Sequence, residues 1–127
     1  LDLMLELTCT RGTAIVLVTH NLGVVAQTAD AVAVMYAGQL VEEASVAGLF
    51  AQALHPYTQG LLASLPRLDA PRQGLTHIPG AVPSLRSLPV GCHFHPRCAK
   101  AFAPCAQNIP PLTNLPDGRR VRCWLYV

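Results

Sequence analysis

Four of the five cysteines of this 127-residue chain lie in its final third, where their thiols could bind a metal or pair with one another. They are Cys92, Cys98, Cys105 and Cys123, separated by five, six and seventeen residues. In a segment with little core of its own, this pattern leaves a metal centre, two disulfides or free structural thiols open. No C-x-x-C pair is present, so the usual zinc-ribbon spacing is missing. Irregular spacing is common at iron–sulfur sites, where loops wrap a larger cluster.

The charges around these cysteines are mostly positive. An oxidised four-thiolate [4Fe–4S] centre carries about two negative charges, which neighbouring bases would offset. Residues 1–54 contain one base against five acids, whereas residues 55–127 contain eight bases against two acids. This asymmetry indicates two units with different roles, and basic surface could also serve nucleic acid. The bases nearest the cysteines in sequence are Arg97, Lys100, Arg119, Arg120 and Arg122.

A second candidate site is the polar cluster Thr19-His20-Asn21, which joins an apolar run to an expected helix. In open α/β sheets, ligands bind beyond the carboxyl ends of strands, and helix N-termini favour anions. His20 would there donate a hydrogen bond to a phosphate oxygen or orient an attacking water. The alternative is an exposed loop histidine. The remaining cysteine, Cys9, lies on the first expected helix and is interpreted as a small buried residue.

The elements that would position these residues indicate an α/β fold. Residues 13–19 are continuously apolar and β-branched, which predicts a central strand buried on both faces of a parallel sheet. The apolar region 14–38 is interrupted by polar residues, so no transmembrane helix is expected. The other expected elements of the first part are a helix over 1–11 stopped by Gly12, a helix capped by Asn21, strands over 31–36 and 39–44 around Ala37-Gly38, and a helix from Ser45 through Leu54.

The pattern changes at His55, which divides the chain into residues 1–54 and 55–127. Pro56 suits the first turn of a helix. Residues 65–89 are rich in proline and poor in periodicity, which predicts an extended, ordered arm. Residues 91–127 contain the four cysteines and little regular structure. The second part is therefore expected to be a small irregular extension.

Three segments, in order, resemble ABC-transporter ATPases. IVLVTHNLGVV at 15–25 is similar to their switch-histidine segment, and DAVAVMYAGQLVE at 30–42 is similar to the strand pair that follows it. The run HNLGVV is similar to the dipeptide and oligopeptide importer branch, with Asn21 where the common form has aspartate. LHPYTQGLL at 54–62 resembles the start of the C-terminal extension of that branch.

The cysteine segment resembles the cysteine motif of the same extension. It comprises GCHFHPRC at 91–98, then Cys105, PPL at 110–112 and VRC at 121–123. The resemblance implies that Cys92, Cys98, Cys105 and Cys123 bind a [4Fe–4S] cluster, with zinc as the alternative metal. His93 and His95 are possible substitute ligands, but are interpreted as flanking residues.

The resemblance implies that the chain is the C-terminal end of the ABC-type P-loop ATPase sheet plus the oligopeptide-transporter extension. The full-length subunit would bind ATP and Mg²⁺, with His20 sensing the terminal phosphate. It would power peptide import with a second ATP-binding subunit, transmembrane permease subunits and, indirectly, a peptide-binding protein. It would lie at the cytoplasmic face of the bacterial inner membrane.

This sequence contains no G-x-x-x-x-G-K-[ST] loop, no magnesium-binding carboxylate pair after a strand and no signature loop. We therefore expect the chain alone neither to bind ATP usefully nor to hydrolyse it. A second hypothesis is a free-standing zinc-binding, basic nucleic-acid module. The bases are not interleaved with aromatic residues, and residues 1–54 would then have no purpose, so no nucleic-acid partner is expected. A thiol oxidoreductase is disfavoured by the missing C-x-x-C motif.

Overall fold

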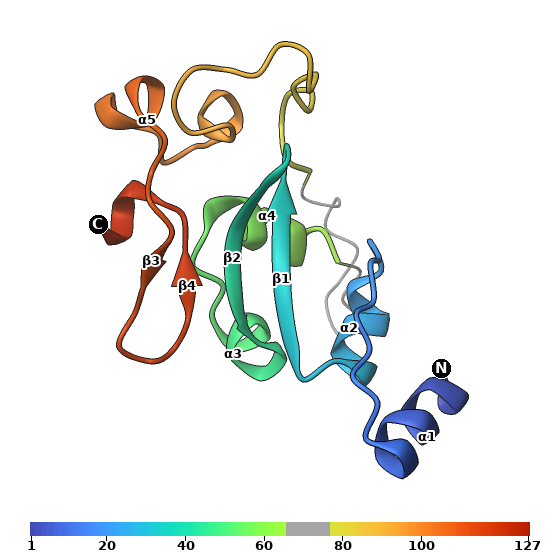
Figure 1. Ribbon diagram of the computed structural model, residues 1–127. Helices are drawn as coiled ribbons and strands as arrows, with labels where there is room; N and C mark the ends of the chain where they lie inside the picture. The colour runs from blue at the N-terminus through green and yellow to red at the C-terminus, as the bar shows by residue number, and fades with distance from the viewer. Residues whose placement is uncertain (66–76) are drawn as a thin grey trace, which may run out of the picture.

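The computed structural model describes residues 1–65 and 77–127 (Figure 1). They form an α/β structure around a four-stranded antiparallel sheet with the strand order β1-β2-β4-β3. Figure 1 shows the two short strands near the C-terminus lying beside β2. The strands are β1 Ala31–Tyr36, β2 Gln39–Ser45, β3 Thr113–Asn114 and β4 Arg120–Val121.

The hairpin of β1 and β2 confirms the predicted strand pair. Its two turn residues, Ala37 and Gly38, have φ angles of 44° and 79°, and two positive φ angles match the twist of a two-residue hairpin. The register then shifts, because Val34 pairs with Glu42 whereas Met35 pairs with Leu40. This bulge leaves Val41 without a partner on β1, and the Val41 carbonyl accepts a hydrogen bond from the backbone N–H of Arg122 at 2.8 Å.

Local capping chemistry explains where the helices begin and end. The first helix, α1 Asp2–Arg11, stops at Gly12, whose φ of 61° is left-handed. The side-chain oxygen of Asn21 accepts from two backbone N–H groups of α2 Leu22–Thr28. The predicted stop at Gly12 and the predicted cap at Asn21 are both confirmed.

The two helices after the hairpin also begin as predicted. The hydroxyl of Ser45 accepts from the N–H of Gly48 and caps α3 Val46–Ala51, which ends earlier than the predicted limit at Leu54. Pro56 occupies the first turn of α4 Pro56–Ala63. The remaining elements are η1 His95–Arg97, α5 Ala103–Gln107 and η2 Trp124–Tyr126.

The predicted central strand over residues 13–19 is wrong for this chain. These residues have no regular secondary structure, and Val16 and Val18 are 92% and 94% exposed. A buried strand is stabilised by ladder hydrogen bonds and by neighbours on both faces. The four-stranded sheet is antiparallel and contains no strand that pairs with this segment. Cys9, expected to be buried, is exposed.

One hydrophobic core connects the two predicted parts of the chain. Tyr36 contacts Tyr57 and Phe94 with ring centroids 4.6 and 5.1 Å apart, and Tyr57 and Phe94 are 5.4 Å apart. Aromatic pairs at these separations stabilise beyond the area that they bury. Residues on both sides of position 54 thus share a core and, through β2 and β4, a sheet. The division at 54/55 stays a prediction. Other buried members of this core are Val34, Val41, Ala44 and Leu49.

The described part of the predicted arm, residues 77–89, has no helix or strand and is attached to the core. The guanidinium of Arg97 donates to the carbonyls of Ile78 at 3.0 Å and Pro79 at 2.8 Å. Ile78 also packs against Gly60, where a Cβ atom would lie 2.7 Å from Ile78 Cγ1. The predicted arm residues 66–76 lie outside the described residues. No helix in the part of the chain that is described is long and apolar enough to cross a membrane.

Gly91 provides a test of the packing around the first cysteine. Its φ is +77°, and a Cβ atom there would lie 2.4 Å from the carbonyl oxygen of Cys105. Gly118 has a similar φ of +83° but no atom within 4 Å of the same position. Gly118→Ala should cost about 1–2 kcal/mol through backbone strain. Gly91→Ala should cost at least about 2 kcal/mol more, because the clash is with backbone. Urea unfolding of the two variants measures the difference, and equal losses would contradict this packing.

Candidate metal centre

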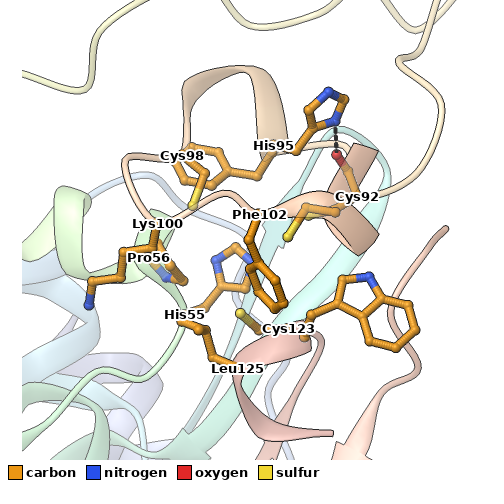
Figure 2. A pocket seen from close by; sticks show the side chains of 12 residues that line it. His55, Pro56, Cys92, His95, Cys98, Lys100, Phe102, Cys123 and Leu125 are labelled. Carbon is orange, nitrogen blue, oxygen red and sulfur yellow. Dashed lines mark hydrogen bonds between the residues drawn. The ribbon is translucent and has the colours of Figure 1, made fainter. Parts of the chain in front are cut away.

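The four C-terminal cysteines line one pocket, although they come from four separate short segments (Figure 2). Cys92 lies in the turn before η1, and Cys98 directly follows η1. Cys105 lies on α5, and Cys123 precedes η2. The structure therefore brings together all four sequence-predicted residues around a common space.

Backbone hydrogen bonds hold these segments in place. The N–H of Cys92 donates to the carbonyl of Cys105 at 2.8 Å and joins the first and third cysteine segments directly. The indole N–H of Trp124 donates to the carbonyl of Asn108 at 3.0 Å and connects η2 to the end of α5. Cys123 is buried with Leu54 and Val121 in a small second core. Short irregular segments are thus ordered by contacts between them rather than by long helices or strands.

All five cysteines are free thiols, so the disulfide alternative is not realised in this structure. Burial raises the pKa values of Cys92, Cys98 and Cys123, and the neighbouring thiolates raise them further. For Cys123, all three other pocket cysteines contribute to the higher pKa. Thiolates that repel one another in this way are stabilised together when cationic metal lies among them.

The pocket offers four thiols as possible ligands and little free space. The enclosed free volume is about 10 Å³, enough for one water molecule. A larger centre therefore requires the surrounding side chains to move apart. Among residues 1–65 and 77–127, no group of three or more histidine, cysteine, aspartate or glutamate side chains is arranged to hold one metal ion. Four free thiols around one space nevertheless match the donor set of a [4Fe–4S] cluster.

Most of the bases expected to offset cluster charge are engaged elsewhere, and of the five only Lys100 lines the pocket. Sequence proximity therefore predicts the position of only one of them relative to the pocket. Arg97 bonds the arm, Arg119 pairs with Asp117, Arg120 pairs with Glu43, and Arg122 donates to the carbonyls of Leu40 and Pro110.

The three histidines singled out from the sequence have different surroundings. His20 is exposed at the bend before α2 and does not line the cysteine pocket. Its phosphate-sensing role stays a prediction. The ring Nδ1 of His93 lies 3.0 Å from the carbonyl oxygen of Ala37. The Nδ1 of His95 lies 2.9 Å from the carbonyl oxygen of Cys92, and His95 lines the pocket. Because carbonyls only accept, both rings carry a proton on Nδ1.

His55 is the pocket residue that sequence reasoning missed. Its side chain is 1% exposed and lines the same space as the cysteines. Its Nδ1 accepts a hydrogen bond from the N–H of Tyr57 at 3.1 Å and caps α4. The signal was present, because a histidine immediately before a helix-starting proline occupies the N-cap position.

A buried carboxylate fixes the backbone at this cap. Glu42 is 0% exposed, and its two oxygens accept from the backbone N–H groups of Leu54 at 2.8 Å and His55 at 2.9 Å. Hydrogen bonds to backbone donors are what make a buried charge tolerable. Glu42 therefore connects the central strand β2 to the residue that lines the pocket.

These features define a class: a small α/β protein region whose irregular C-terminal segments surround a thiol-lined pocket. The family model described as "Oligopeptide/dipeptide transporter, C-terminal region" matches residues 41–105, which include Glu42, His55 and the first three pocket cysteines. The chain belongs to this family of peptide ABC-transporter ATP-binding proteins.

Three curated relatives illustrate the similarity. The oligopeptide transport ATP-binding protein AppD of Bacillus subtilis is 51% identical over 126 residues, which are 99% of this chain and 38% of the relative. The probable peptide ABC transporter ATP-binding protein y4tR of Sinorhizobium fredii is 47% identical over 98% of this chain and 37% of its own length. The dipeptide transport ATP-binding protein DppD of B. subtilis is 46% identical over the same shares. The chain thus spans less than two fifths of these relatives.

The burial of His55 predicts a pH dependence of stability. Burial lowers the pKa of His55 from 6.5 to about 4, because the charged ring loses hydration. Between these values the unfolded chain binds a proton that the folded chain does not, so stability is complete above pH 6.5 and falls as the pH drops towards 4. The loss is about 3 kcal/mol. In metal-free protein, His55→Asn keeps a capping oxygen and should remove this pH-dependent loss of stability. Parallel pH profiles of urea unfolding for the two proteins would contradict the assignment.

Proposed function

We propose that the chain is the C-terminal portion of the ATP-hydrolysing subunit of a bacterial peptide importer. The observation that carries this proposal is the 51% identity, over 99% of the chain, to an oligopeptide transport ATP-binding protein. In this proposal residues 1–54 complete the ATPase domain and residues 55–127 form the extension. The subunit works with a second ATP-binding subunit, permease subunits and a peptide-binding protein, at the cytoplasmic face of the inner membrane.

The nucleotide chemistry belongs to the full-length subunit. The sequence given contains no phosphate-binding loop, so this chain alone neither binds ATP nor hydrolyses it. In the full-length subunit, ATP and Mg²⁺ are bound, and His20 contacts the terminal phosphate. The apolar residues 13–19 then pair with strands of the remaining ATPase domain. The high exposure of Val16 and Val18 supports this pairing, because burying apolar side chains of this kind is favourable in free energy.

The cysteine pocket binds a [4Fe–4S] cluster through Cys92, Cys98, Cys105 and Cys123. The support is the presence of four free thiols around one space. When bound, the cluster supplies four metal–sulfur bonds that crosslink four segments otherwise held by few contacts. Transport requires no redox step, so we assign the centre a structural role. Zinc remains the alternative outcome of metal analysis.

The nucleic-acid hypothesis has less support in the structure than in the sequence. Phosphate binding needs cationic side chains that are free to approach the backbone. All five bases near the cysteines are instead hydrogen-bonded within the chain: Arg97, Lys100, Arg119, Arg120 and Arg122.

The metal assignment is tested by single substitutions. After anaerobic purification, Cys→Ser at each of positions 92, 98, 105 and 123 should remove most bound iron and the broad absorption near 400 nm expected of a cluster. Cys9→Ser is the matched control and should change neither, because Cys9 is exposed on α1. A colourless wild-type protein with one zinc per chain would instead identify the alternative metal. Wild-type protein without any metal would contradict the proposal that the four cysteines form a metal centre.

The ATPase assignment is tested at His20 in the full-length subunit. His20→Ala should leave ATP binding nearly unchanged and lower the hydrolysis rate by at least about tenfold, as expected for a group that acts on the transferred phosphoryl. The exposed His77 serves as control, and His77→Ala should retain the wild-type rate. Steady-state hydrolysis and nucleotide binding are measured on the same preparations. A wild-type rate in His20→Ala would refute the role of this histidine.

A further inference from the structure

We propose that His55 is a hydrogen-bond donor to the centre held by the four cysteines, acting through its Nε2–H group. This inference rests on the proposed metal centre and adds a residue that is not a ligand. Such donors around metal-bound sulfur adjust the reduction potential and stability of a centre.

The cap of α4 fixes the tautomer of His55. Its Nδ1 lies 3.1 Å from the backbone nitrogen of Tyr57, and a backbone N–H can only donate. Nδ1 must therefore present its lone pair and carry no proton. A neutral imidazole has one ring proton, which is then on Nε2. The helix start thus leaves His55 with an N–H donor on the opposite side of its ring.

The ring that carries this donor lies at the sulfur-lined space. Figure 2 shows the His55 imidazole among the three labelled cysteines, Cys92, Cys98 and Cys123. The ring is held by its bond to Tyr57, by the Glu42 bond to its own backbone and by Phe94, 5.7 Å away between ring centroids.

The Nε2 atom itself remains available. It makes no hydrogen bond to any residue that the structure describes, whereas Thr58 Oγ1 is the only fully covered polar side-chain atom there without a partner. Nε2 is therefore not fully covered, and His55 lines the pocket while being 1% exposed.

The other side-chain N–H groups that line the pocket come from residues that each make a hydrogen bond within the chain. Lys100 donates to the side chain of Gln59 at 3.0 Å, and the indole of Trp124 donates to the carbonyl of Asn108. His95 donates from Nδ1 to the carbonyl of Cys92. His55 is therefore the aromatic N–H donor that the protein fold leaves unused, while Lys100 keeps two further N–H groups. Reduction adds negative charge to a cluster, so an N–H group pointed at its sulfur favours the reduced state.

Two substitutions separate the cap from the donor. His55→Asn places an amide oxygen near the position of Nδ1 and keeps the cap, but has no group that reaches the position of Nε2. His55→Gln reaches the position of Nε2 with an amide N–H and loses the cap. A purely structural histidine would be replaced better by asparagine, whereas a donor would be replaced better by glutamine.

The experiment uses the full-length subunit, purified anaerobically, with iron and sulfide content measured first. A potentiometric titration, monitored by electron paramagnetic resonance, then gives the ratio of reduced to oxidised centre at each potential. We expect His55→Asn to lower this ratio about tenfold at fixed potential, a shift of about 59 mV for a one-electron couple. His55→Gln should stay within about twofold of wild type while having the lower melting temperature.

An unchanged potential in His55→Asn with full iron content would overturn the inference and leave the metal centre intact. A wild-type subunit without iron or sulfide would instead overturn the centre itself, and the inference with it. If the variants fail to fold, the ring ¹⁵N shifts of histidine-labelled wild-type subunit decide the question. Protonated Nε2 supports the donor, and protonated Nδ1 overturns it.

Discussion

The buried carboxylate of Glu42 is the contact on which the arrangement of this chain depends. Its two oxygens accept from consecutive backbone N–H groups, those of Leu54 and His55, which lie between α3 and α4. An unpaired carboxylate at this depth would be too costly to retain. The residue also pairs with Val121 of β4, so one strand position joins the hairpin, the start of α4 and the C-terminal segment. The ring of His55, and with it one wall of the cysteine pocket, is placed by this bond.

Features encoded in neighbouring residues were predictable. Gly12 ends α1, Asn21 and Ser45 cap their helices, and Ala37-Gly38 turns the hairpin, because each depends on the chemistry of a few consecutive residues. Features that require distant partners were not. The apolar segment 13–19 has strand composition but no neighbouring strand in this chain. Conversely, β3 and β4 are two residues each, too short to show alternation, and they exist because β2 offers a free edge.

The same distinction holds at the site. The number and region of the cysteines left a metal centre, disulfides and free thiols open; the family resemblance implied a common centre, and the fold places all four on one pocket. The partners of the bases could not be read from the sequence, because they depend on carbonyls exposed elsewhere: Arg97, for example, bonds the arm 18 and 19 residues before it. His55 was read only as part of a helix start. Its second role depends on the segments that close over it from 37 or more positions further along the chain.

The pairing of β4 with β2 also constrains how the chain folds during synthesis. The hairpin of β1 and β2 can form as soon as it leaves the ribosome, but the Arg122 side chain that bonds Leu40 lies 82 residues later. Until then β2 has an unpaired edge beside an incomplete core, the kind of edge through which nascent chains pair with each other. The appearance of β4 closes that edge. A chain truncated before residue 120 would therefore keep one edge of β2 unpaired and available to other chains.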